Sequence, residues 1–257
     1  MTKYIEEVKV VGQWILNTAT KEIDLIAPRI AVEAVPGQFV NVQVSRHTAP
    51  LLRRPLGIAR VDREHGVISL IYRVIGEATR ILADVCSGDV LSVVGPLGNG
   101  FDRSARKPLL VGGGTGLAPL LNLAEAFKAE GIVPHVLMGG RTEEELFWKD
   151  LYEGIAGSIA LTTDDGTLGT KGTVMALLPD MLRDGGYDCV YVCGPAPMMK
   201  AVSAAVLEQK IKCQVSLEKY MACGLGACLS CSCQGIGKRI KVCKDGPVFR
   251  AEEVAEW

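Results

Sequence analysis

Four cysteines near the carboxyl end have the type and spacing of metal ligands. Cys223, Cys228 and Cys231 follow the pattern C-x4-C-x2-C, and eleven residues separate Cys231 from Cys243. The first three match the spacing of plant-type [2Fe–2S] ligands, and soft thiolates suit iron–sulfur clusters. A structural zinc site also takes four cysteines, but it favours paired C-x2-C knuckles and only one such pair is present. The spacing therefore predicts an iron–sulfur cluster, with structural zinc as the alternative.

Outside this set, the cysteines are expected to carry no metal. Cys233 lies two residues after Cys231, so on an extended segment both side chains share one face. The C-x2-C spacing favours Cys231 as the ligand, which leaves Cys233 as a buried thiol. We expect Cys86, Cys189 and Cys213 to be unligated as well, because a cytosolic chain does not use its cysteines as a disulfide framework.

Two glycine-marked segments have the pattern of a nucleotide site. "LLVGGGTGLAP" joins an apolar run to a helical pattern through Gly112, Gly113, Gly114, Thr115 and Gly116. Glycines let a backbone approach a phosphate, and the amides of a following helix favour an anion. The spacing departs from the usual dinucleotide fingerprint, since Leu117 takes the third glycine position. "VYVCGPAPMM" ends a second apolar run at Cys193, Gly194 and Pro195, and open sheets bind ligands at such strand ends. The alternative is a strand–helix turn without a ligand.

Two segments in the first hundred residues have arginines at strand ends. In "LLRRPLG", Arg54 precedes Pro55, and an arginine held by a rigid proline turn can pair with a pyrophosphate. "IYRVIGEAT" adds Tyr72, Arg73 and Thr79, which are an aromatic ring, a further cation and a hydroxyl at a turn. Either segment alone favours the simpler interpretation of solvated arginines on strand edges.

The secondary structure expected around these residues changes near Phe101, from short strands to strands that alternate with helices. Up to about Phe101, short strands separated by Gly, Asp and Pro predict a small antiparallel β-barrel, with one helix in "EATRILADV". Strands then alternate with helices, which predicts a parallel sheet with crossover helices. The tail from about Ile211 is short and rich in Cys and Gly, so it needs a staple such as a metal site. We predict three domains: a barrel over 1–101, an α/β domain over 102–210 and a cluster domain over 211–257.

The order of the segments resembles a known superfamily. "PGQF", "RRPLG", "IYRVIGEAT", "GPLGNGF", "GGGTGLAP" and "CGPAPMM" together resemble the ferredoxin–NADP reductase superfamily. With the cysteine-rich tail, the chain is similar to the electron-transfer subunits of NAD-linked (class 1B) dihydroorotate dehydrogenases. The resemblance covers residues 4 to 250. It implies an FAD-binding barrel, an NAD-binding domain and a [2Fe–2S] domain.

The resemblance also implies a role for each matching residue. The FAD positions are Arg54, which would hold the pyrophosphate, then Pro55, Leu56, Gly57, Ile71, Tyr72, Arg73, Gly76, Ala78 and Thr79. The nicotinamide nucleotide would face Gly112 to Pro119 and Cys193 to Pro195. The cluster would bind Cys223, Cys228, Cys231 and Cys243. Gly57 replaces the family's serine, and Ala78 replaces a glycine although alanine tolerates a left-handed backbone poorly.

The implied function is an electron conduit. Electrons would pass between NAD and the FMN of a catalytic partner subunit, which oxidises dihydroorotate to orotate, and two copies of each subunit would form a heterotetramer. The alternatives are a reductase subunit serving a hydrogenase, sulfide or ferredoxin system, and a non-redox nucleotide-binding module with structural zinc. No catalytic acid or base stands out, because His47, His65 and His135 have the settings of surface or strand-edge residues.

Composition limits the partners and the location. The formal net charge of −1, with 22% charged and 48% hydrophobic residues, gives no reason to expect nucleic acid or an acidic membrane as a partner. "MTKYIEEVKV" has no apolar signal region and no uncharged run has the composition of a membrane span, so we expect a cytoplasmic protein.

Two finer expectations concern the ligand and the partner. Glu143, Glu144 and Glu145 follow the second strand of the α/β region, with only Arg141 as a nearby cation. Because a 2′-phosphate would need cations there, we expect NAD rather than NADP. An apolar surface around the cluster is expected to meet the partner, with Leu225, Leu229, Val248 and Phe249 as candidates, although these four side chains could instead pack the tail onto the barrel.

Overall fold

The computed structural model describes residues 2–257, and the first of them form a closed antiparallel barrel. Its strands run in the order β1-β2-β5-β4-β3-β6. Their bounds are β1 (Tyr4–Asn17), β2 (Thr20–Ile26), β3 (Phe39–Gln43), β4 (Arg54–Asp62), β5 (Val67–Arg73) and β6 (Val90–Leu97). Helices α1 (Pro28–Glu33) and α2 (Glu77–Ala83) fill the connections. The predicted barrel and its helix after "IYRV" are confirmed, and α1 is a second helix that was not expected.

Alternation along the strands produces the barrel core. In β1, Val8 and Val10 are buried while Lys9 between them is exposed, as the two-residue period of a strand requires. Strand β3 departs from this pattern, since Val40 and its neighbour Asn41 are both buried. The outer face of β3 is covered because the carboxyl-terminal segment packs on it.

A seven-stranded sheet forms the second part of the molecule, in the order β10-β9-β8-β7-β11-β12-β15. Its strands are β7 (Pro108–Gly113), β8 (His135–Gly140), β9 (Ser158–Thr163), β10 (Thr170–Lys171), β11 (Cys189–Cys193), β12 (Lys212–Ser216) and β15 (Val248–Arg250). All pairings are parallel except that of β15 with β12. The chain moves from β7 to β8 on one side and later to β11 on the other, so the order reverses at β7.

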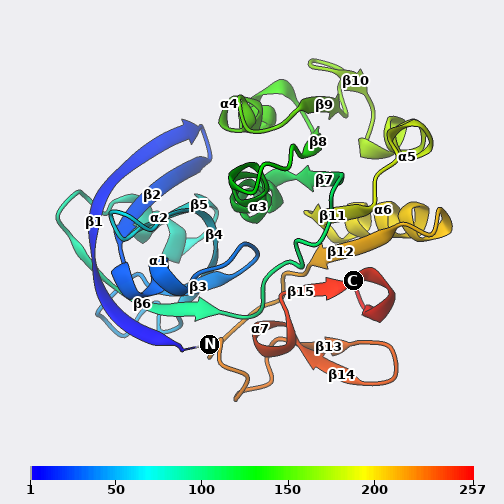
Figure 1. Cartoon of the computed structure of the whole chain (residues 1–257). Helices are drawn as coiled ribbons and strands as arrows, with labels where there is room; N and C mark the ends of the chain where they lie inside the picture. Colours follow the sequence, from blue (N-terminus) through cyan, green and yellow to red (C-terminus); the bar gives the residue numbers. More distant parts are fainter. Residues whose placement is uncertain (1) are drawn as a thin grey trace.

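Helices and short 3-10 turns connect these strands. They are η1 (Gly114–Gly116), α3 (Leu117–Ala129), η2 (Glu143–Leu146), α4 (Trp148–Tyr152), η3 (Val174–Ala176), α5 (Leu178–Gly185) and α6 (Ala196–Glu208). Figure 1 shows α3 between the barrel and the sheet. Asn122 of α3 is buried and donates to the carbonyl of Ile58 in β4, 3.3 Å away. The helix therefore joins the two parts of the molecule.

The carboxyl-terminal segment lies beside the barrel and next to the sheet, at the lower side of the view (Figure 1). It contains β13 (Ser232–Gln234), β14 (Arg239–Lys241), α7 (Val242–Asp245) and η4 (Ala251–Glu253), with β13 and β14 paired. Asn99, just after β6, donates to the carbonyls of Asp245 and Val248 at 3.0 Å each. Strands β12 and β15 lie within the nucleotide sheet, so the tail is built into that sheet; the boundary at residue 210 stays a prediction.

One expectation about the tail is wrong in part. Val248 and Phe249 were expected on an exposed apolar surface, but they are only 5% and 6% exposed. The reason is that β15 pairs with β12 and places both side chains against neighbouring cores. Leu225 and Leu229 are 45% and 57% exposed, as a contact surface requires.

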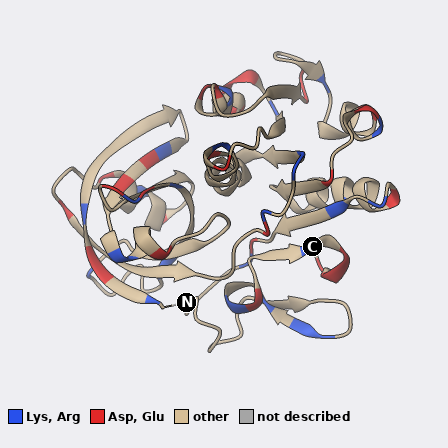
Figure 2. Cartoon of the chain, in the orientation of Figure 1, with Lys and Arg blue, Asp and Glu red and all other residues tan. Residues whose placement is uncertain are grey.

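Charge and hydropathy on the described chain are unremarkable. Lys and Arg are interspersed with Asp and Glu over the barrel, the sheet and the carboxyl-terminal segment (Figure 2). Among residues 2–257, no helix is long and apolar enough to cross a membrane.

Candidate functional site

A cavity of about 730 Å³ lies at the carboxyl ends of β7 and β11. Its walls include Arg73 from the barrel and these residues from the two predicted glycine segments: Gly113, Gly114, Thr115, Gly116, Gly194 and Pro195. Strands β7 and β11 are neighbours, with Gly112 opposite Cys193 in register. The two segments that the sequence separates by some eighty residues therefore meet at the point where the strand order reverses, which is where open sheets bind ligands.

Close backbone packing explains the glycines. A Cβ on Gly116 would lie 2.5 Å from the carbonyl carbon of Cys193, and a Cβ on Gly112 would lie 2.4 Å from Leu117 Cδ2. Gly114 has a φ of +57°, a left-handed conformation that glycine adopts without strain. Gly112 and Cys193 are buried beneath the cavity and do not line it, so they support the floor.

Sequence reasoning missed Glu218, which also lines this cavity. Glu218 as a whole residue is exposed, but the cavity wall keeps water from its carboxyl, and this desolvation raises the pKa of Glu218. Burial, with the Glu218 charge as a smaller cause, raises the pKa of the Cys193 thiol, so Cys193 is a neutral core thiol at neutral pH. Glu218 follows β12 closely, and a search for polar residues at the ends of all parallel strands would have found it. Trp257 lines the same cavity, and no local signal in the sequence indicated that the last residue folds back there.

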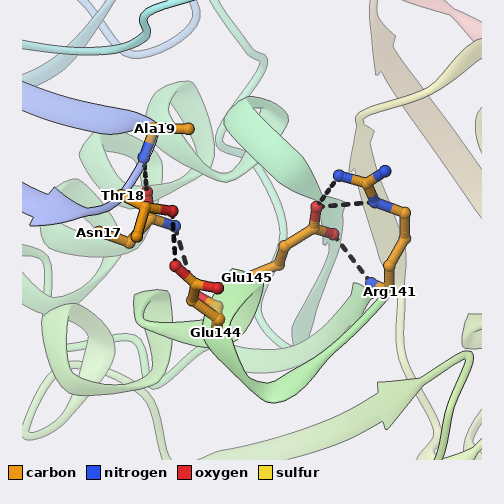
Figure 3. A network of polar contacts seen from close by, with 6 residues as sticks. All are labelled: Asn17, Thr18, Ala19, Arg141, Glu144 and Glu145. Carbon is orange, nitrogen blue, oxygen red and sulfur yellow. Dashed lines mark hydrogen bonds and ion pairs between the residues drawn. The ribbon is translucent and has the colours of Figure 1, made fainter.

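The tip of the β1–β2 hairpin forms another wall, also unforeseen (Figure 3). Thr18 Oγ1 donates to Glu144 Oε1 at 2.6 Å, and Asn17 Nδ2 donates to the Glu144 carbonyl at 3.2 Å. Asn17 Oδ1 accepts from the amide of Ala19 at 3.0 Å, which orders the turn. The barrel and η2 are thus tied together across the mouth of the cavity.

The predicted flavin residues lie on adjacent barrel strands. Arg54 to Gly57 begin β4, and Ile71 to Arg73 end β5, its antiparallel neighbour. Arg53 donates to the carbonyl and hydroxyl of Ser92, at 2.6 and 3.0 Å, and is therefore fixed within the barrel. Arg54 donates to nearby main-chain carbonyls, including that of Leu52. Of the two arginines, Arg54 is the one with a guanidinium available to an anion.

The other flavin positions divide between the two faces of β5. Tyr72 is buried in the barrel core, where its hydroxyl donates to Gln13 and burial raises its pKa. Ile71 points the opposite way, into the cluster of apolar side chains around α3. Arg73 is the predicted flavin residue that reaches the nucleotide cavity.

The concern about Ala78 is not supported by the backbone. Ala78 lies in α2 with an ordinary helical conformation, so its position does not require glycine. The turn is instead fixed by Thr79, whose Oγ1 accepts from the amides of Ile75 and Gly76 at 3.0 Å each. At Gly57, an added Cβ would meet only Pro119, at 3.7 Å or more, so the missing family serine leaves room beside the strand.

The three histidines lie away from this chemistry. His47 and His65 are exposed, and His65 Nδ1 contacts Asp62 Oδ2 at 2.7 Å. His135 begins β8, at the end of the strand opposite the cavity.

The four predicted cluster cysteines form two pairs joined by main-chain amides. The amide of Cys228 donates to Cys223 Sγ at 3.4 Å, and that of Cys223 donates to Cys228 Sγ at 3.5 Å. The amide of Cys243 donates to Cys231 Sγ at 3.4 Å. The amide of Leu225 is a second donor to Cys223 Sγ, at 3.3 Å. Amides directed at sulfurs are the surroundings that tune iron–sulfur clusters.

The loop that carries Cys223 and Cys228 has backbone conformations that let it turn tightly around a bound group. Gly224 and Gly226 have φ values of +67° and +86°, and Leu229 has +64°, which is uncommon for a residue with a side chain. Hydrogen bonds from Ser230 and from Cys223 lower the pKa of Cys228 to about 6, so this thiol readily becomes a thiolate ligand.

Two thiolates per iron suit a binuclear cluster. Within residues 2–257, no three His, Cys, Asp or Glu side chains converge as a single metal ion would need. A [2Fe–2S] cluster asks only for a pair of ligands on each iron, and the pairs Cys223–Cys228 and Cys231–Cys243 have that form. Cys233 is fully buried in β13, and burial raises the pKa of its thiol. Cys231 and Cys243 are buried to the same degree, so the assignment of Cys233 as an unligated thiol stays a prediction.

Asn41 connects the barrel to the cluster loop. It is 1% exposed on β3, opposite Pro55 of β4, and its Nδ2 donates to the carbonyl of Cys223 at 3.4 Å. A Cβ on Gly224 would lie 2.1 Å from the same nitrogen, so only glycine fits there. Asn41 Oδ1 is buried with no hydrogen-bond partner among the described residues. An unpartnered buried acceptor between the flavin strands and the cysteines fits a bound group at this junction.

Comparison with known proteins agrees with this geometry. A family model described as the iron–sulfur cluster binding domain of dihydroorotate dehydrogenase B matches residues 218–255, and an oxidoreductase NAD-binding domain matches residues 110–204. The dihydroorotate dehydrogenase B (NAD(+)) electron transfer subunit of Bacillus caldolyticus is 38% identical over 97% of this chain and 98% of its own. That of Fusobacterium nucleatum is 39% identical over 85% of this chain and 86% of its own. The chain belongs to this family of electron transfer subunits.

Solved structures share the fold of this chain. The structure of an NADH-dependent reduced ferredoxin–NADP oxidoreductase, described for flavin-based electron bifurcation, has a TM-score of 0.88 and 32% identity over 97% of this chain and 90% of its own. A ferredoxin reductase of carbazole 1,9a-dioxygenase has a TM-score of 0.69 and 23% identity, over 82% and 67%, and shares the fold. Membership of the dihydroorotate dehydrogenase B family makes the chain an NAD-linked electron-transfer subunit. The iron–sulfur description also favours a cluster over structural zinc.

Proposed function

We propose that the chain carries electrons between NAD and a partner subunit through FAD and a [2Fe–2S] cluster. The observation that carries this proposal is the contact between Asn41 and the Cys223 loop, because it joins the flavin strands to the cysteines. The nucleotide cavity reaches the same barrel at Arg73. Three adjoining cofactor regions on one chain support transfer from each to the next.

The barrel residues proposed for FAD have distinct tasks. Arg54 pairs with the pyrophosphate, since its guanidinium is not used inside the barrel as that of Arg53 is. Thr79 fixes the turn before α2, because its Oγ1 accepts from the amides of Ile75 and Gly76. The remaining flavin positions are Pro55, Leu56, Gly57, Ile71, Tyr72, Arg73, Gly76 and Ala78. Bound FAD supplies the exchange between a two-electron hydride and single electrons, which the cluster accepts one at a time.

The residues proposed for NAD and those proposed for the cluster also have separate tasks. Residues 113 to 116 bring main-chain amides and the start of α3 toward the pyrophosphate of NAD, and Gly194 and Pro195 form the facing wall. Gly112 supports this loop from beneath the cavity. Cys193 supports that wall from below as a neutral thiol. The cluster is held by Cys223, Cys228, Cys231 and Cys243, in a unit that we delimit as 211–257 after the barrel (1–101) and the NAD domain (102–210).

The partner is proposed from the names of the relatives. We propose an FMN-containing catalytic subunit that oxidises dihydroorotate to orotate in pyrimidine biosynthesis, in a heterotetramer with two copies of each chain. Tyr220, Leu225 and Leu229 surround the cysteine loop and are 96%, 45% and 57% exposed, so they suit a protein surface. The cytoplasm is the proposed location, because its reducing conditions keep the thiols available to iron.

A second candidate rests on the solved relative. The similarity to an NADH-dependent reduced ferredoxin–NADP oxidoreductase extends over 97% of this chain, so a partner that exchanges electrons with ferredoxin and NADP is the alternative. The identity of 32% is lower than the 38% shared with the dihydroorotate dehydrogenase relative over the same fraction. The first candidate is therefore favoured.

Spectroscopy and reconstitution test the proposal. The purified chain should show flavin absorption with a broad iron–sulfur shoulder, and anaerobic NADH should bleach both. Adding the chain to the catalytic subunit should confer NADH formation from dihydroorotate and NAD. A colourless protein containing zinc, or equal activity with and without the chain, would reject the proposal. NADH formation only with reduced ferredoxin would select the second candidate.

A further inference from the structure

The rim of the nucleotide cavity carries an ion pair next to the end of β8. Arg141 Nε donates to Glu145 Oε1 at 2.7 Å, its Nη2 donates to the same oxygen, and its main-chain amide donates to Oε2 at 2.9 Å (Figure 3). Both residues line the cavity. The Arg141–Glu145 pair can therefore contact the part of a bound nucleotide that lies near the end of β8.

Both known determinants of nucleotide choice are present in this pair. At the end of the second strand of such sheets, an acid binds the ribose 2′-hydroxyl of NAD, whereas an arginine accommodates the 2′-phosphate of NADP. Here β8 is the second strand, Arg141 is the arginine and Glu145 is the acid. Glu145 takes the donors on Nε and Nη2 of the guanidinium, the side of Arg141 that could otherwise bind a phosphate with two parallel hydrogen bonds.

The neighbouring charges strengthen this arrangement. The charge of Asp164, after β9, also acts on Arg141, as a smaller cause beside the hydrogen bond to Glu145 that raises the pKa of the guanidinium. Arg73 acts on Glu145 from the barrel, and with Arg141 it keeps the pKa of Glu145 low, with the hydrogen bond from Arg141 as the main cause. Glu144 is turned away and bound to Thr18. A 2′-phosphate at this rim would meet the Glu145 carboxylate and a guanidinium that already pairs with it.

We propose that Glu145 sets the preference for NAD over NADP by holding Arg141. This inference rests on the proposed function, because it concerns the nucleotide of the same cavity. The sequence predicted NAD from the three acids Glu143 to Glu145 together, and the proposal assigns this preference to Glu145 alone. The carboxylate accepts from a ribose hydroxyl, and at the same time it uses the donors that a 2′-phosphate would need.

Substitution of the acid tests the proposal in the purified complex. Glu145→Gln keeps the size of the side chain and frees Arg141, so the ratio of kcat/KM for NADPH to that for NADH should rise by about tenfold or more. Direct binding of 2′,5′-ADP relative to 5′-AMP should rise in parallel, independently of turnover. Glu145→Gln combined with Arg141→Gln should lose the gain. As a matched control, Glu153→Gln breaks an exposed pair of the same spacing, Lys149–Glu153 at 3.9 Å, and should leave the ratio unchanged.

Two further variants make the outcome decisive. Glu145→Gln with Asp164→Asn removes both carboxylates whose charges act on Arg141, so an unchanged ratio in this variant and in the single one overturns the proposal. Glu143→Gln removes the same charge from η2 without touching Arg141, and an equal gain there would show that net charge decides. Failure of the wild-type complex to bind 5′-AMP or to oxidise NADH would instead remove the proposed function itself.

Discussion

Gly116 is the position where the nucleotide site and the fold depend most directly on one missing atom. A Cβ at Gly116 would lie 2.5 Å from Cys193 C, Cys193 O and Gly194 N, all main-chain atoms that cannot rotate away. Ordinary contacts need about 3.4 Å, so Gly116→Ala forces η1 and the end of β11 apart by about 1 Å. Overpacking of this kind costs about 2 kcal/mol, or a factor of about 30 in the folding equilibrium.

The same displacement acts on nucleotide binding. The amides of 113 to 116 would leave the position from which they face the pyrophosphate, and a shift of about 1 Å costs up to about a hundredfold in function. We expect the KM for NADH to rise at least tenfold in Gly116→Ala, measured as NADH-dependent reduction of ferricyanide. Thermal unfolding followed by circular dichroism measures the loss of stability.

A stability control separates the two effects. Gly131, beyond α3, has a φ of +76° and open space around its missing Cβ. Gly131→Ala therefore costs about 1–2 kcal/mol through its backbone alone and should leave the KM for NADH unchanged. A wild-type KM in Gly116→Ala, or an equal rise in Gly131→Ala, would refute the reasoning.

The remaining predictions concern the cluster, the flavin and pH. Cys231→Ser should abolish the iron–sulfur absorbance and the bound iron, whereas Cys233→Ala should keep both; the reverse result would overturn the ligand assignment. Arg54→Gln should release FAD on gel filtration, and retained stoichiometric flavin would contradict its proposed pairing with the pyrophosphate. Because desolvation of its carboxyl raises the pKa of Glu218, the folded state holds a proton that the unfolded state releases. Stability should therefore fall as pH rises from the ordinary glutamate value through the raised one, by a small amount because much of the residue is exposed. Glu218→Gln should remove that fall in melting temperature, and an unchanged pH profile would count against it.

Local signals made the broad architecture predictable. A two-residue alternation of apolar side chains needs only neighbouring residues, so the barrel strands could be read from segments such as "PGQFVNVQV". Glycines at strand ends and cysteines separated by four and by two residues are equally local signals, because a turn or a cluster loop is built from consecutive residues. Chain order added more, since a strand–helix alternation can return to the same sheet edge in few ways. This is why Gly116 and Cys193 were expected at one edge.

Contacts between distant segments were not predictable, because no periodicity records them. Asn41 had the pattern of an ordinary strand residue, and only folding places its amide against Cys223, far along the chain. Val248 and Phe249 had the composition of an exposed apolar pair, but antiparallel pairing with β12 buries them.

The sequence alone therefore determined the types of cofactor and the cysteines and glycines suited to hold them, since those depend on residue type and short spacing. Tertiary structure alone decided how the sites adjoin. It brought Thr18 of the barrel to Glu144 across the cavity and selected Glu145, from three successive acids, as the partner of Arg141. The physical reason is that a side chain's direction depends on the packing of its whole element, which the residues beside it in the sequence do not specify.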